Sequence, residues 1–358
     1  MITYGPFASA LAPLVQAHQA EGKTSAVVPI NDLYDEFNFG ERTPFAIRWF
    51  LQTAKHNCKT APSYLLLNGR ASLDPRNYLG FGNLDLVPTR IVQSTSLMTA
   101  SDDWFSDFTD SGMPTIPTGR LPVSTVDDAT TVVGKIAGYE GQSTNGSWSA
   151  NALMVADTDD TENFSGDSLT VQSKLPSTMQ ATDVFVDVVG ATAAKTDIIN
   201  AINSGQGLVN YLGHGSEEQW SGSDIFDTTS VTSLTNGSQL PVFLIMDCLN
   251  GFFQDVYAQP LGVTLLLASN GGAVAVMASS GLNQSPPQTK LDIYVVQNAW
   301  NAKGSRLGDV IVTAKSHISD ADVRRTFNLF GDPAMRVKQS SPSATSGAKA
   351  PIEGKPLS

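Results

Sequence analysis

The stretch GLVNYLGHG (207–215) joins a short apolar run to a histidine that stands between two glycines. Apolar runs of this length, bounded by glycine, are typical of strands covered on both faces of a parallel sheet. A second run, PVFLIMDC (241–248), ends on a cysteine and is followed by the turn residues Asn250 and Gly251. Both stretches therefore predict buried strands that end in a chemically reactive side chain, His214 and Cys248.

The same alternation extends along the chain in both directions. Further runs dense in Val, Ile and Leu, bounded by Gly, Pro or Asp, occupy residues 24–30, 64–69, 152–157, 183–189 and 272–279. Between the runs lie segments with a helical pattern, at 43–57, 127–140, 167–175, 196–204, 261–269, 291–300 and 308–316. Strand followed by helix, repeated in this way, predicts a doubly wound α/β sheet.

A Gly- and Ser-rich segment, EGQSTNGSWSAN (140–151), divides the chain into two parts. It predicts an N-terminal α/β subdomain over 1–145 and a second subdomain over 146–338. Residues 339–358 are rich in Ser, Pro, Ala and Gly without an apolar period, which is typical of a flexible linker or tail. We therefore expect this chain to be part of a longer multidomain protein.

The composition excludes several classes of partner. The 358 residues include 22 Lys and Arg against 34 Asp and Glu, a formal net charge of −12. A surface of that sign repels nucleic acid and anionic membranes. No uninterrupted apolar run approaches the roughly 18 residues that a membrane span needs. The first residues do not pair a basic segment with an apolar one, so they predict no signal peptide, and the chain is either cytoplasmic or a mature or excised domain.

Only two cysteines are present, Cys58 and Cys248. Two are too few for a disulfide framework or a cysteine-rich zinc site. They leave open one disulfide or two unrelated thiols.

His214 and Cys248 together suggest a nucleophilic site. If their strands are parallel neighbours, both side chains leave the sheet at the same carboxyl edge. An imidazole favours the thiolate of a nearby cysteine and can then protonate a leaving amine. The amide groups of Gly215 and Cys248 would form an oxyanion hole, and Gly213 would let a substrate backbone approach closely. Taken singly, such a histidine is more often a loop residue and such a cysteine a core residue.

Four stretches in order along the chain carry a further signal: NYLGHGSEEQW (210–220), MDCLNGFF (246–253), AVMASSGLNQS (275–285) and FNLFGDPAMRV (327–337). Together they resemble the gingipain family of cysteine peptidases, which belongs to the caspase-like clan. The resemblance extends to about Lys338. It implies that the second subdomain is a caspase-like, mainly parallel sheet flanked by helices, preceded by a smaller α/β subdomain.

The resemblance also implies an activity. His214 would be the general base and Cys248 the nucleophile of an endopeptidase that cleaves peptide bonds through a thioester acyl-enzyme. A sortase-like transpeptidase with the same dyad, or a non-catalytic surface or assembly module, stays open as an alternative. We expect protein or peptide substrates and a secreted or cell-surface location. The chemistry requires no cofactor, while a structural calcium ion without assigned ligands is compatible with the resemblance.

Acidic residues near the end of one predicted strand are candidates to orient the histidine. In the family an acid at this place faces the imidazole, and the register of ALMVADTDDTENF (152–164) puts Asp159 there, with Asp157 as the alternative. A carboxylate on the imidazole would fix its tautomer. These acids could instead solvate a loop or bind calcium. TASDDWFSDFTDSG (99–112) is a second candidate for calcium or a solvated turn.

Two residues are candidates for substrate binding. Gingipains that cleave after Arg or Lys use an acid at the base of the specificity pocket. Asp167 is the acid best placed for this role in the present sequence. An Asp at the start of a helix also serves as an N-cap, which is the alternative for this residue. Trp220 follows the histidine loop and would either wall the cleft or pack beneath the loop. From Asp167 we expect cleavage after Arg or Lys.

Overall fold

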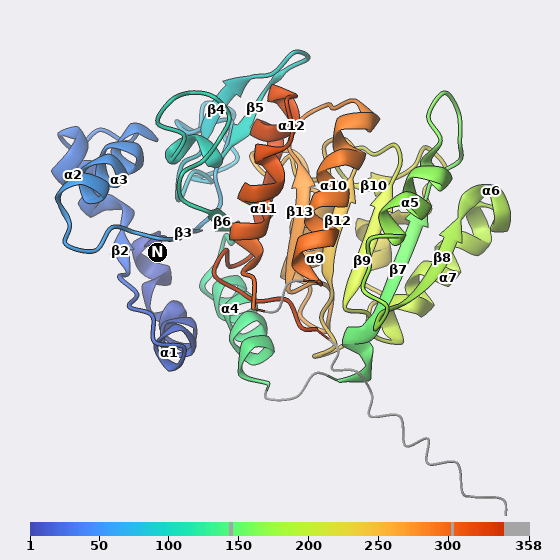
Figure 1. Cartoon of the computed structure of the whole chain (residues 1–358). Helices are drawn as coiled ribbons and strands as arrows, with labels where there is room; N and C mark the ends of the chain where they lie inside the picture. The colour runs from blue at the N-terminus through green and yellow to red at the C-terminus, as the bar shows by residue number, and fades with distance from the viewer. Residues whose placement is uncertain (143–145, 302–303, 340–358) are drawn as a thin grey trace, which may run out of the picture.

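The computed structural model describes residues 1–142, 146–301 and 304–339, and its centre is a ten-stranded sheet (Figure 1). In spatial order the strands are β2 (Val28–Pro29), β1 (Ile2–Thr3), β3 (Leu65–Asn68), β6 (Thr118–Leu121), β14 (Phe327–Phe330), β13 (Ala275–Ser279), β12 (Val242–Met246), β9 (Leu208–Leu212), β7 (Asn151–Ala156) and β8 (Gln180–Phe185). Two hairpins stand apart from it, β4 (Arg90–Gln93) with β5 (Met98–Ser101), and β10 (Gln219–Trp220) with β11 (Phe226–Asp227).

The sheet is mostly parallel. Strands β7, β8, β9, β12 and β13 run in one direction, and β14 lies antiparallel to β13. On its other side β14 pairs in parallel with β6, which leads on to β3, β1 and β2. One sheet therefore continues through both predicted subdomains. The predicted boundary at residue 145 and residues 340–358 of the predicted tail lie outside the described residues, so that division stays a prediction.

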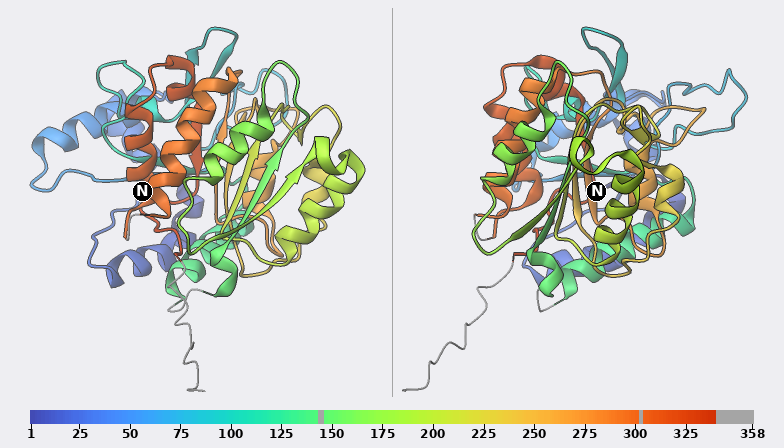
Figure 2. Two further views of the ribbon diagram at one scale, coloured as in Figure 1. Left: turned by 45° about the vertical axis from the view of Figure 1, so that its right-hand side comes forward. Right: turned by 90° about the vertical axis from the view of Figure 1, so that its right-hand side faces the viewer.

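Helices cover both faces of the sheet, as Figures 1 and 2 show. The α-helices are α1 (Ala12–Ala20), α2 (Ile30–Asn38), α3 (Phe45–Asn57), α4 (Val126–Gly141), α5 (Phe164–Gln172), α6 (Val186–Val189), α7 (Ala191–Asn203), α8 (Thr228–Val231), α9 (Leu261–Leu267), α10 (Ser285–Ala299), α11 (Leu307–Ser316) and α12 (Ala321–Thr326). Short 3-10 helices are η1 (Gly5–Leu11), η2 (Asp103–Phe105) and η3 (Ser147–Ala150). This confirms the predicted α/β class. None of the helices in the described ranges is long and apolar enough to cross a membrane.

The central strands that were predicted from apolar runs are buried along their length. Every residue of β9, β12 and β13 is buried, as expected for strands covered on both faces. The predicted strand at 183–189 is partly wrong, because β8 ends at Phe185 and α6 follows it. Gly190, with φ 79°, ends that helical turn in a conformation that favours glycine. Of the predicted strand at 24–30, only β2 is extended in the sheet.

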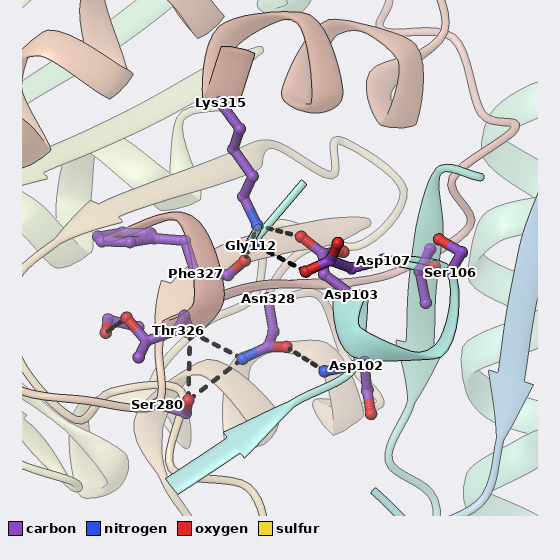
Figure 3. Close-up of polar contacts among 12 residues, drawn as sticks. Asp102, Asp103, Ser106, Asp107, Gly112, Ser280, Lys315, Thr326, Phe327 and Asn328 are labelled. Carbon is purple, nitrogen blue, oxygen red and sulfur yellow. Dashed lines mark hydrogen bonds and ion pairs between the residues drawn. The ribbon is translucent and has the colours of Figure 1, made fainter. Parts of the chain in front are cut away.

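Two buried cations pair with the acidic stretch at 99–112, and one of them, Lys315, joins the two halves of the chain. Arg120 of β6 is fully buried and its Nε lies 2.6 Å from Asp102, while Nη1 donates to two backbone carbonyls. Lys315 of α11 is equally buried, and its Nζ contacts Asp103 and the carbonyl of Phe327, each at 2.5 Å (Figure 3). A buried charge is tolerated only when it is paired in this way.

These contacts correct the prediction of a solvated turn at 99–112. Asp102, Asp103 and Asp107 are all buried. Asp107 accepts from the amide of Gly112 at 2.6 Å, whereas Asp102 and Asp103 pair with the two buried cations. The amide of Asp102 also donates to Asn328 of β14 (Figure 3). The acidic stretch is therefore a structural junction, in which Asp102 and Asp103 pair with buried cations and Asp107 is held by a nearby backbone amide.

Candidate active site

The two predicted reactive residues emerge side by side at one edge of the sheet. Strands β9 and β12 are adjacent and parallel, and their last paired residues are Leu212 and Met246. His214 and Cys248 each lie two residues beyond that pair. The amide of Gly213 donates to the carbonyl of Met246 at 3.3 Å, which keeps the two loops together past the end of the strands.

Cys248 is half-buried, and its thiol faces the loop that follows β13. The amide of Asn283 lies 3.4 Å from Sγ, and Sγ lies 3.7 Å from the carbonyl of the same residue. Burial raises the pKa of the Cys248 thiol. The thiol is therefore protonated in the resting molecule at neutral pH, and a base is needed to generate the thiolate.

The turn after Cys248 is fixed by its neighbours. Leu249 has a φ of 67°, in the left-handed region. The side-chain amide of Asn250 donates to the carbonyls of Ser216 and Gln219 in the histidine loop. Asn250 therefore ties the cysteine turn directly to the loop that carries His214.

The side chain of His214 is exposed, and its Nε2 lies 2.9 Å from the carboxylate of Asp160. Its ring also meets Phe164 edge-on, with centroids 5.2 Å apart. The prediction that Asp159 contacts the imidazole is therefore corrected by one residue. Asp159 instead accepts from the amide and hydroxyl of Ser165 at 2.9 and 2.7 Å, so its carboxylate turns toward α5.

Asp157, the predicted alternative, contacts the histidine through the backbone. Its carboxylate accepts from the amide of His214 at 3.2 Å. Asp160 thus contacts the ring and Asp157 the backbone of the same residue. A backbone amide of Glu162 and then the imidazole lower the pKa of Asp160, which keeps this carboxylate ionised. Within the described chain, the imidazole makes no hydrogen bond to Sγ of Cys248.

The two amide groups that were predicted to form the oxyanion hole are free to bind a ligand. Across residues 1–142, 146–301 and 304–339, the amides of Gly215 and Cys248 have no hydrogen-bond acceptor. Both are therefore available to a bound carbonyl oxygen. Gly215 is also required sterically, because a Cβ added there would lie 2.0 Å from Oδ2 of Asp247.

Gly213 does not have the role predicted for it, and of the two places considered for Trp220 the structure shows the one beneath the loop. Gly213 is buried, and a Cβ there would lie 2.3 Å from Oη of Tyr211 and 2.5 Å from Cβ of Asp157, so the glycine serves packing and not the approach of a substrate. Trp220 is fully buried and stacks on Tyr211, with ring centroids 4.4 Å apart. Tyr211 in turn donates to the carbonyl of His214 at 2.7 Å. The two rings support the loop from beneath.

Asp167 lies in the first turn of α5, but it does not cap the helix. The cap is Asn163, whose side chain accepts from the amide of Gly166 at 2.8 Å. Asp167 is half-buried and accepts from the hydroxyl of Thr289 in α10 at 2.9 Å. The capping alternative is therefore wrong for this residue.

Asp247 is a site residue that the sequence reasoning missed. It directly precedes Cys248, is fully buried beneath Gly215, and neither of its carboxyl oxygens has a hydrogen-bond partner among the described residues. Burial raises the pKa of Asp247 well above its ordinary value. The available signal was an acidic residue at the end of an otherwise apolar strand, where an unpaired charge is costly.

Comparison with known proteins identifies the family. The model of peptidase family C25 matches residues 1–338. The chain belongs to peptidase family C25. The predicted family and the predicted enzyme class, a cysteine peptidase, are therefore confirmed.

Curated relatives of this C25 chain include gingipains of Porphyromonas gingivalis. Gingipain R2 is 27% identical over 246 residues, which cover 63% of this chain and 33% of the relative. Lys-gingipain HG66 is 25% identical over 202 residues, which cover 56% of this chain and 11% of the relative. The chain thus spans about a third of the one relative and about a tenth of the other.

A solved structure confirms the fold. The crystal structure of the Arg-specific cysteine proteinase gingipain R matches with a TM-score of 0.78 at 22% identity, over 94% of this chain and 77% of that one. The C25 chain therefore has the gingipain-like arrangement of a mostly parallel sheet flanked by helices.

The buried carboxyl of Asp247 generates a pH-dependent prediction. A carboxyl whose pKa is raised by folding stabilises the fold below its unfolded pKa, and this contribution is lost as the pH rises. Asp247→Asn removes that dependence. We expect the unfolding free energy of the variant, relative to the unsubstituted chain, to increase over the pH range that begins at about 4, the ordinary pKa of an aspartate, and extends upward to neutral pH. Urea unfolding over this range measures it, and a difference independent of pH would contradict a protonated Asp247.

Proposed function

We propose that this chain is the catalytic part of a cysteine endopeptidase in which His214 and Cys248 form the working dyad. The observation that carries the proposal is the in-register parallel pairing of β9 with β12, which brings both residues to one edge of the sheet. Membership of family C25 supports it. In a non-catalytic module we would expect at least one of the two residues, or their glycine context, to have been lost.

The proposed reaction begins with a proton transfer within the dyad. Asp160 occupies Nε2 of His214, which leaves Nδ1 to take the proton from Sγ of Cys248. The thiolate attacks the substrate carbonyl, and the amides of Gly215 and Cys248 bind the oxygen that becomes negative. The imidazolium then protonates the departing amine, and a thioester to Cys248 remains. Water, activated by the neutral imidazole, hydrolyses the thioester and restores the thiol.

Two carboxyl groups have opposite roles in this scheme. Asp160 is ionised and stabilises the imidazolium that forms on His214. Asp247 lies next to Cys248 and, when protonated, places no negative charge beside the thiolate. Without substrate, the imidazole of His214 makes no hydrogen bond to Sγ of Cys248 in the described chain. Substrate binding brings the two groups together, because catalytic hydrogen bonds are often long in the free enzyme.

A preference for Arg or Lys before the scissile bond is the proposed specificity. Asp167 is half-buried, lies in the first turn of α5 after the loop that carries Asp160, and is held by Thr289 and not by a capping interaction. Relatives of the chain are named as an Arg-specific proteinase and as Lys-gingipains. The exposed Lys290 beside Thr289 is the neighbouring charge that opposes this preference.

The cellular setting and a second outcome of the thioester belong to the same proposal. We infer that the chain acts outside the cell or at its surface, as part of a longer protein, and a structural calcium ion without assigned ligands stays compatible with it. An amine that reaches the thioester before water would make the enzyme a transpeptidase. Product analysis by mass spectrometry with an added amine nucleophile separates the two outcomes.

The dyad generates the first functional prediction. We expect Cys248→Ala and His214→Ala each to lower kcat by roughly a thousandfold or more, because each removes a step that the other residue cannot replace. The unfolding free energy should change by only about 1 kcal/mol or less. Asp160→Asn should cost less activity than either change, and Cys58→Ser, at an exposed thiol, should cost none. Digestion of a diverse peptide mixture compares the peptidase activity of these four variants with that of the unsubstituted chain. Full activity in Cys248→Ala or in His214→Ala would refute the mechanism.

Asp167 generates a second functional prediction. Because a hydrogen bond to a charged group contributes about 1.5–3 kcal/mol, Asp167→Asn should lower kcat/KM for substrates with Arg or Lys before the scissile bond by about ten- to a hundredfold. Substrates with a neutral residue there should change by only about twofold. Asp197→Asn, at an exposed acid on α7, is the matched control. A cleavage profile dominated by small, apolar or acidic residues would remove Asp167 from the specificity pocket.

A further inference from the structure

Three ligand-type side chains meet at a place remote from the catalytic loops. His18 of α1, Glu140 near the end of α4, and Asp332 in the turn after β14 bring one imidazole nitrogen and two carboxylate oxygens within 4.8 Å of one another. His18 and Asp332 are buried, and Glu140 is half-buried. The three residues are far apart in sequence, so the fold itself assembles this cluster.

Glu140 has no compensating partner in the cluster. Its Oε1 is buried and makes no hydrogen bond within the described chain. The nearby Arg306 pairs with Glu21 at 2.7 Å, and Lys338 donates to a backbone carbonyl. Among the described residues, no Lys or Arg forms an ion pair with Glu140 or Asp332. A buried carboxyl group without a partner is costly, and a bound cation removes that cost.

His18 is held in an orientation suited to a metal ligand. Its Nδ1 lies 3.1 Å from the hydroxyl of Ser25, and its Nε2 lies 2.7 Å from Asp332. When Nδ1 carries the proton and donates it to Ser25, Nε2 presents its lone pair toward the two carboxyl groups. Metal-bound histidines are usually oriented by a second hydrogen bond of this kind.

We propose that His18 Nε2, Glu140 and Asp332 bind one divalent transition-metal ion, with Zn²⁺ the best fit. One imidazole and two carboxylates are ligands that zinc accepts in its usual tetrahedral sites, whereas Ca²⁺ and Mg²⁺ take oxygen ligands only. The ion replaces the hydrogen bond between His18 and Asp332. A cavity of ≈ 660 Å³ lined by His18 and Asp332 provides an entry path.

The ion would have a structural role. Glu140 lies shortly before η3, which leads into the amino end of β7, whereas the catalytic residues follow the carboxyl ends of β9 and β12. Figure 1 shows α1 and the end of α4 at the lower end of the molecule, below the starts of these strands. The metal would tie α1, α4 and the turn after β14 together without touching the peptidase site.

The test uses the full chain carrying Cys248→Ala, so that the catalytic thiol neither binds metal nor degrades the sample. After treatment with EDTA, titration with Zn²⁺ should show one equivalent bound and a higher melting temperature. Glu140→Gln and His18→Asn in this background should each weaken binding by about ten- to a hundredfold. Glu162→Gln, at an acid in the loop between β7 and α5 and outside the cluster, is the matched control and should leave binding unchanged. Co²⁺ in place of Zn²⁺ should give visible d–d absorption that both ligand variants lose.

Three results would overturn the proposal. These are no Zn²⁺ or Co²⁺ binding by the parent chain, binding that survives both ligand substitutions, or stronger binding of Ca²⁺ than of Zn²⁺. Circular dichroism checks that the variants fold. If His18→Asn does not fold, Glu140→Gln decides the question, because it keeps the shape of the side chain and removes only its charge.

Discussion

The in-register parallel pairing of β9 with β12 is the constraint on which the site depends. Parallel neighbours end at the same edge of a sheet, and the paired ends Leu212 and Met246 put His214 and Cys248 at the same level. A slip of one residue would exchange the side chains between the two covered faces of the sheet and so disrupt the close packing on both. The core therefore fixes where the two reactive side chains emerge, although neither belongs to it.

Polar groups beneath the two loops complete what the strands begin. Tyr211 holds the carbonyl of His214, Asn250 holds the histidine loop from the cysteine side, and Asp247 fills the space under Gly215. Each of these side chains lies at the end of a buried strand or in the turn that follows it. Asp247 is the costly member, because neither of its oxygens finds a hydrogen bond in the described chain. A neutral Asp247 lowers this cost and keeps negative charge away from the thiol.

The sequence predicted the features that follow from periodicity and missed those that depend on loop conformation. Apolar runs identified the central strands, and the residues at their ends identified the edge of the sheet. The acid that contacts the imidazole was predicted one position early, since the structure shows Asp160 at the ring and Asp159 at Ser165. The reason is that the conformation of the loop after β7 leaves no periodic signal in the sequence. For Trp220 the sequence left two places open, and stacking on Tyr211 puts it beneath the loop. Strand β6 was missed because it contains Arg120, and the sequence alone does not show that Asp102 and backbone carbonyls compensate this buried charge.

The central claim is that Cys248 forms a thioester with the help of His214. Rapid mixing with an ester of a peptide that the enzyme cleaves, followed by acid quenching and mass spectrometry, measures this intermediate directly. The account predicts one acyl group on Cys248, none on Cys58, release of the group by neutral hydroxylamine, and a much slower formation in His214→Ala. An acyl group on another residue, or turnover without any acylated protein even when deacylation is made slow, would contradict it.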